Sequence, residues 1–111
     1  MDDPEREELE AEFTERIYQV YRDAAKLNYH ATAFATMLQQ IGGVATARHC
    51  LLADTSGFTR LWELRALHLS VEFVVLQPAW RSLFTELELE TARGRLAAHG
   101  APELVAKAEA S

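Results

Sequence analysis

The stretch PEREELEAEFTERIYQVYRDAAKL, residues 4–27, decides the fold class of this 111-residue chain. Its apolar side chains recur at intervals of four and three residues, at Leu9, Phe13, Ile17, Tyr21 and Ala24. This spacing places them on one stripe of an α-helix and leaves the glutamates outside. Asp3 before Pro4 is typical of a helix start, because a proline at the first helical position loses no hydrogen bond. The sequence therefore predicts one long amphipathic helix here.

Shorter helical patterns follow, separated by residues that suit turns. Asn28 is expected to end the first helix, because its side chain tolerates the left-handed region. The Gly42-Gly43 pair supplies a flexible break, and the run Asp54-Thr55-Ser56-Gly57 has turn composition. We expect helices over residues 31–41, 44–52 and 58–67.

The C-terminal half shows two clear helix starts. Ser70 is expected to cap a short buried helix that includes residues 73–76, since an isolated strand would find no partner for its backbone. Thr85 and Glu88 have the spacing of a capping box, which predicts a helix over residues 86–99 that ends at Gly100. Its inward side chains are expected to be Leu87, Ala92 and Leu96.

These elements predict an all-α fold, a compact orthogonal bundle of about five to seven helices. Hydrophobic residues make up 49% of the chain and charged residues 25%, which suits one globular domain. We place this domain at residues 1–100. Residues 101–111 are expected to form an alanine-rich tail, with too little apolar surface to dock firmly.

The charge and the cysteine content narrow the setting. The net charge is −6, and acidic residues crowd the first twelve positions, so phosphate backbones and anionic lipids are unfavourable partners. No run approaches the roughly 20 apolar residues of a membrane span, and no leader peptide opens the chain. The single Cys50 cannot form an intramolecular disulfide, which fits the cytoplasm.

Residue patterns for catalysis, metals or cofactors are not found. The four histidines, at 30, 49, 68 and 99, lack the spacing of a metal site and are expected near the surface. Adjacent His49 and Cys50 would point about a hundred degrees apart on a helix, so they cannot form a dyad, and Cys50 is interpreted as a core residue. We therefore expect a chain that is not an enzyme and holds no metal or cofactor.

One further pattern, at residues 42–49, allows both a functional and a structural interpretation. Gly42-Gly43 followed by Thr46, Arg48 and His49 is superficially similar to a helix-turn-helix, but Arg48 is the only fixed positive charge between Lys26 and Arg60. Two core helices joined by a turn are the favoured interpretation.

The carboxylates of Glu63 and Glu72 stand among apolar neighbours, so we expect each to be partly buried and paired with Arg93 or Arg60. Trp62 and Trp80 are expected in the core.

Several strings resemble a family of small bacterial all-helical proteins of unknown function, whose members also occur as modules of larger proteins, including nucleases. The strings are Gly57-Phe58-Thr59-Arg60-Leu61-Trp62-Glu63, Leu69-Ser70-Val71-Glu72, Val75-Leu76-Gln77-Pro78-Ala79-Trp80, Leu83-Phe84-Thr85-Glu86, Ala92-Arg93-Gly94-Arg95-Leu96 and, upstream, Tyr29, Ala31-Thr32, Phe34 and Gly42-Gly43 with Thr46-Ala47-Arg48. The resemblance implies a bacterial, cytoplasmic protein and no catalytic residues. The chain departs from the pattern at Arg65-Ala66, where the family has glycine and arginine, and at His68, where it has aspartate.

Our leading hypothesis is a non-catalytic module that binds a protein partner or a second copy of itself. The candidate contact residues are Tyr18, Tyr29, Trp80, Arg93 and Arg95. A nucleic-acid accessory domain is the alternative, which would gather Arg48, Arg60, Arg65, Arg93 and Arg95 on one side. A small enzyme using Glu63, Glu72 and a histidine is the third hypothesis.

Overall fold

The computed structural model describes residues 3–53 and 56–111 of the chain. The long amphipathic helix predicted from the opening stretch is α1 (Pro4–Lys26), and Asp3 caps it by accepting a hydrogen bond from the Glu5 N–H at 3.0 Å. Its buried residues are Phe13, Ile17, Val20 and Ala24, while Leu9 and Tyr21 lie half-buried at the edges of the stripe. The predicted periodicity is therefore confirmed.

The next helix, α2 (Thr32–Leu52), consists of two helical pieces that meet at a kink. Gly42 has φ 81° and ψ 174°, a conformation that interrupts the helix where the glycine pair predicted a break. At Gly43 the backbone approaches α1 so closely that an added Cβ would lie 2.7 Å from the Thr14 Cα. Thr14 accepts a hydrogen bond from the Gly43 N–H at 3.0 Å, which fixes the crossing of the two helices.

Helix α3 (Ser56–Glu63) is shorter at its C-terminus than predicted. The helix was expected over residues 58–67, but Arg65 adopts a left-handed φ of 57° and ends it. This reversal turns Ala66 and Leu67 into the core, where both are buried. Of the predicted turn, residues 54–55 lie outside the described part of the chain.

Three helices end in the same hydrogen-bonding pattern. After α1, α3 and α5, one residue with positive φ is followed by a residue whose N–H bonds back five positions. This is the Schellman motif, in which the left-handed residue is usually glycine. The left-handed residues are Asn28, Arg65 and Gly100.

The middle of the chain forms short elements around the core. These are η1 (Leu67–Leu69), α4 (Val71–Val75) and η2 (Arg81–Leu83). Ser70 caps α4 by accepting from the Phe73 N–H at 3.1 Å, as predicted. All five residues of α4 are buried, so the short helix runs through the centre of the molecule.

The last two helices are α5 (Glu86–Ala98) and α6 (Pro102–Ala110). The predicted capping box of Thr85 and Glu88 is present. The predicted inner face of α5 was wrong at Leu87, which is 71% exposed, because the stripe in fact includes Leu89 together with Ala92 and Leu96. The expectation that the alanine-rich end would dock weakly was also wrong, since α6 packs on α5 and α4 and fully buries Ala108.

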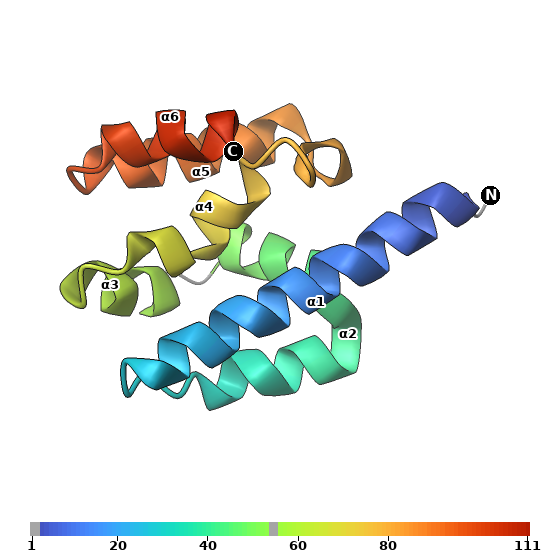
Figure 1. Cartoon of the computed structure of the whole chain (residues 1–111), viewed down its shortest axis with the longest axis horizontal. Helices are drawn as coiled ribbons and strands as arrows, with labels where there is room; N and C mark the ends of the chain where they lie inside the picture. The colour runs from blue at the N-terminus through green and yellow to red at the C-terminus, as the bar shows by residue number, and fades with distance from the viewer. Residues whose placement is uncertain (1–2, 54–55) are drawn as a thin grey trace.

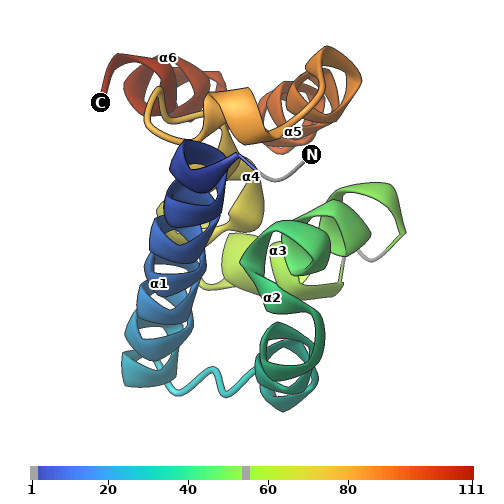
Figure 2. The ribbon, with the colours of Figure 1, turned by 90° about the vertical axis from the view of Figure 1, so that its right-hand side faces the viewer.

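The helices form an all-α bundle with no strand among residues 3–53 and 56–111, as predicted. Helices α5 and α6 lie side by side at one end of the molecule, α1 packs on α2, and α4 joins the two parts (Figure 1). The view in Figure 2 shows α1 running away from the α5–α6 pair along one edge. The radius of gyration is 13.2 Å, which matches a compact domain of this length.

The two tryptophans differ in how far they are buried. Trp80 is half-buried, with its ring edge-on to Phe13 at 5.7 Å, whereas Trp62 is 47% exposed, which corrects the expectation of a core position. Trp62 lies near the end of α3 and contacts the His99 ring instead. No helix in the described part of the chain combines the length and the apolar character that a membrane span requires.

Candidate binding cavity

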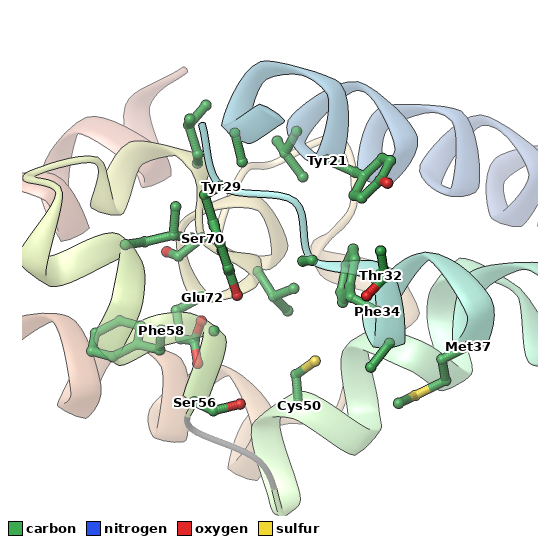
Figure 3. A pocket seen from close by; sticks show the side chains of 18 residues that line it. Tyr21, Tyr29, Thr32, Phe34, Met37, Cys50, Ser56, Phe58, Ser70 and Glu72 are labelled. Atoms are coloured by element: carbon green, nitrogen blue, oxygen red, sulfur yellow. The ribbon is translucent and has the colours of Figure 1, made fainter. Parts of the chain in front are cut away.

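A cavity of about 270 Å³ opens between α1, the start of α2, α3 and the start of α4. Its walls are mostly apolar, and its rim includes the exposed residues Thr32, Ala33 and Ser56. The side chains that line it converge from helices distant in sequence (Figure 3). Its apolar and aromatic lining residues include Val20, Tyr21, Tyr29, Phe34, Met37, Phe58, Leu61 and Leu69.

Tyr29 and Cys50 reach into this cavity from opposite sides. The Tyr29 ring extends from the loop between α1 and α2 toward α3 (Figure 3). A Cβ at Gly57 would lie 3.4 Å from the Tyr29 hydroxyl, which places the end of the Tyr29 side chain against the first turn of α3. The half-buried Cys50 points its thiol inward from the end of α2 (Figure 3). Tyr29 therefore bridges two walls, and Cys50 lies at the floor rather than in the packed core.

One carboxylate, Glu72, forms part of the cavity wall and is 2% exposed. Its Oε2 accepts a hydrogen bond from Arg95 Nη1 at 2.7 Å. The same guanidinium donates to the carbonyl oxygens of Cys50 at 2.8 Å and Leu51 at 2.7 Å. These carbonyls belong to the last turn of α2, where the helix dipole favours a cation. Arg95 thus joins α2, α4 and α5 behind the cavity.

Burial raises the pKa of the Glu72 carboxyl above its ordinary value. The hydrogen bond and the positive charge of Arg95 act in the opposite direction, and the burial effect is larger. Glu72 and Arg95 form an ion pair. The raised pKa means that removing the carboxylate from water costs more free energy than its interaction with Arg95 contributes. The ionised form of the Glu72 carboxyl therefore depends on its interaction with Arg95.

The aromatic residues expected at an interaction surface occupy three separate positions. Tyr29 lines the cavity, Tyr18 is half-buried on α1, and Trp80 packs near η2. None of the three is fully exposed, and only Tyr29 contributes to the cavity. Their role in binding stays a prediction.

The arginines expected at a surface are engaged inside the chain. Arg93 bonds Glu86 and Glu109 at 3.2 Å each, and so connects α5 to α6. The predicted pairing of Glu72 with an arginine is present, although its partner is Arg95. Glu63 was expected to be partly buried, but its side chain is 55% exposed. Its predicted ion pair with Arg60 is present, at 3.9 Å.

The nucleic-acid alternative needed five arginines on one side. Arg48 instead bonds Glu88 at 3.1 Å and the Leu83 carbonyl at 3.0 Å, and Thr46 beside it is fully buried. Arg60, Arg93 and Arg95 are paired as described above. This arrangement therefore does not support a DNA-binding surface at residues 46–49.

The enzyme hypothesis needed Glu63, Glu72 and a histidine in one cleft. Glu72 lines the cavity, but neither Glu63 nor any histidine does. His99 packs edge-on to Phe58 at 4.8 Å, and its Nδ1 lies 2.8 Å from the Arg95 carbonyl oxygen. Within the described residues, no three histidine, cysteine or acidic side chains form a group suited to a metal ion.

Comparison with known proteins returned no relative: no protein-family model, no curated protein and no solved structure matches the chain. The cavity is therefore the feature from which a function can be inferred. Sequence reasoning missed it, because its lining comes from five separate segments. The one local signal was the run of small residues after Tyr29, at Ala31, Thr32 and Ala33.

Proposed function

We propose that the chain is a non-catalytic protein-interaction module, and that its cavity receives a bulky apolar side chain of the partner. The observation that carries this proposal is a preformed apolar cavity of about 270 Å³ in a domain of 111 residues. Protein interiors contain few voids larger than a water molecule, so a cavity of this size indicates a binding role. A 150 Å³ apolar cavity holds benzene, and this one has room for an aromatic side chain.

The form of the cavity suits an anchor residue rather than a buried metabolite. Its rim is formed by the exposed first turns of α2 and α3, so an extended or helical segment has access to the opening. Anchor side chains at interfaces typically fill desolvated pockets lined by apolar and aromatic groups. The ring of Tyr29 contributes aromatic surface to this lining.

The proposal includes a bacterial, cytoplasmic setting. The resemblance described above implies it, and a single cysteine, with no second one in the sequence to form a disulfide with, suits a reducing compartment. A nucleic-acid partner remains the less favoured alternative, since most of the arginines that it would use are paired with glutamates.

A displayed peptide library tests this function directly. We expect selection on the wild-type chain to enrich peptides that share one bulky apolar residue, and replacement of that residue by alanine to abolish binding. Cys50→Leu places a branched side chain with two more non-hydrogen atoms in the cavity, and we expect it to abolish binding. Cys50→Ala leaves the cavity open and should retain binding. Peptides that bind Cys50→Leu as well as Cys50→Ala would refute the cavity as the receptor.

A further inference from the structure

A second hollow, of about 690 Å³, lies between the C-terminal half of α1, the segment after α3, and α6. Its lining carries four lysine or arginine side chains, one exposed histidine and a single acidic side chain, Asp23, which Lys26 already contacts at 3.5 Å. Apolar residues form its floor, among them the buried Phe73. The cations are Arg16, Lys26, Arg65 and Lys107.

These cations stand out because the chain pairs most of its positive charges. Six of the eleven lysines and arginines make ion pairs with described carboxylates, namely Arg6, Lys26, Arg48, Arg60, Arg93 and Arg95. Of the five that make no ion pair with a described residue, three line this hollow: Arg16, Arg65 and Lys107. In a chain of net charge −6, unpaired positive charge is thus concentrated at one place.

The opposite charge is concentrated on the first turns of α1. Between Asp3 and Glu12 the chain carries six carboxylates and one arginine, and only Glu10 forms an ion pair there. Residues 3–8 are all exposed, and this part of α1 extends beyond the other helices (Figure 1). We call residues 3–8 the acidic arm.

The arm and the hollow of one molecule cannot meet. The nearest members of the two sets, Glu8 and Arg16, both lie on the continuous helix α1 and are eight residues apart, which is about 12 Å along a helix. A rigid helix cannot fold back over that length. Their charges are therefore complementary only between two copies.

We propose that the acidic arm of one copy docks in the basic hollow of a second copy, so that the chain associates head to tail. The contact joins two different surfaces, so it closes as a symmetric dimer where both arms dock reciprocally and extends into a ring or a filament where each copy docks on a different neighbour. It is independent of the cavity proposed above, since the two share only Leu69 among their lining residues. Exposed ion pairs are individually weak and are screened by salt, so we expect a weak association that is strongest at low ionic strength.

Sedimentation equilibrium of the full chain tests this inference, with two neutralised variants. The hollow variant carries Arg65→Gln and Lys107→Gln, and the arm variant carries Glu7→Gln and Glu8→Gln. Each should associate at least about fivefold more weakly than the wild type, because each loses two charge pairs. A one-to-one mixture of the two should form a heterodimer that grows no further, since one intact arm meets one intact hollow.

Matched controls remove the same charge elsewhere. Arg22→Gln with Arg60→Gln, and Glu90→Gln with Glu103→Gln, change exposed residues outside the hollow and the arm. They should associate like the wild type, and raising the salt from about 0.05 M to about 0.5 M should disperse all associated species. A wild-type chain that stays monomeric at low salt and high concentration, or a mixture of variants that stays monomeric, overturns the inference.

Discussion

At the scale of single residues, the ion pair of Glu72 and Arg95 is more deeply buried than the other ion pairs of the described residues. The side chain of Glu72 is 3% exposed and that of Arg95 is 18% exposed. Breaking one partner of such a pair is more costly than breaking a surface pair, because a charge is left buried without compensation. The guanidinium also satisfies two carbonyls of α2, so its loss affects two helices at once.

We predict that Arg95→Met lowers the free energy of unfolding by about 3 kcal/mol, measured by urea denaturation at neutral pH. Arg93→Met is the matched control two positions away, where both partners of the pair are about 30% exposed. It should cost about 1 kcal/mol or less. Equal losses for the two variants would contradict the structural role assigned to Arg95.

The raised pKa of Glu72 gives a second prediction, with a definite sign. Between its ordinary pKa of 4.5 in the unfolded chain and its higher folded value, the folded state holds the extra proton. The stability that Glu72 contributes is therefore complete below pH 4.5 and falls as the pH rises through the folded value. Glu72→Gln does not titrate, so its stability relative to the wild type should improve between about pH 4 and about pH 7.

Urea denaturation of both proteins at the two pH values measures this change. The exposed substitution Glu103→Gln serves as the control, because Glu103 shows no such burial. A stability difference between Glu72→Gln and the wild type that is independent of pH would show that the Glu72 pKa is not raised.

At the scale of helices, the crossing of α1 and α2 depends on one missing side chain. A Cβ at Gly43 would lie 2.7 Å from both the Thr14 Cα and the Thr14 Oγ1, and a backbone atom cannot move aside without shifting α1. Gly43→Ala is therefore expected to destabilise the fold by about 2 kcal/mol. Gly94→Ala should instead stabilise it by about 1 kcal/mol, since nothing lies within 4 Å of the added Cβ on α5.

Thermal unfolding followed by circular dichroism compares these two alanine variants directly. The same substitution should move the midpoint down at position 43 and up at position 94. Shifts of the same sign would mean that α1 and α2 do not approach one another as described.

The end of α3 offers another prediction. Arg65 holds a left-handed φ of 57°, where a side chain is strained and glycine is not. Arg65→Gly should raise the free energy of unfolding by about 1 kcal/mol, with a smaller gain for Asn28→Gly, because asparagine tolerates this region. Chemical denaturation of dilute protein, which excludes any effect of association, measures both. A loss of stability on Arg65→Gly would contradict the Schellman end.

Among the helices, the starts could be predicted from the sequence more reliably than the ends and the buried faces. The caps at Asp3, Ser70 and Thr85 were predicted because each depends on a residue and its near neighbours. The end of α3 was not, because an arginine in the left-handed region carries no local signal. Leu87 was placed inward on composition, yet the position of α4 selects Leu89 for the core instead. Local chemistry sets helix starts, and tertiary packing sets which face is buried.

At the scale of the whole molecule, the all-α class followed from periodicity, but the cavity did not. Its walls come from helix ends and loops that sequence spacing cannot bring together, and no metal or nucleophile pattern marks them. Likewise, three of the unpaired cations meet in the hollow only because α1, α3 and α6 are arranged as they are. Charge composition indicated an acidic chain, and of the five arginines that the nucleic-acid alternative grouped on one side only Arg65 lines this hollow.

The central claim is that the cavity between α1, α2, α3 and α4 accepts an apolar side chain. Titration of the isotopically labelled chain with indole, the side-chain group of tryptophan, tests it most directly by nuclear magnetic resonance. We expect saturable shifts confined to cavity residues such as Tyr29, Phe34 and Gly57, which persist in Cys50→Ala and vanish in Cys50→Leu. Shifts that do not saturate, or that are unchanged by Cys50→Leu, would contradict it.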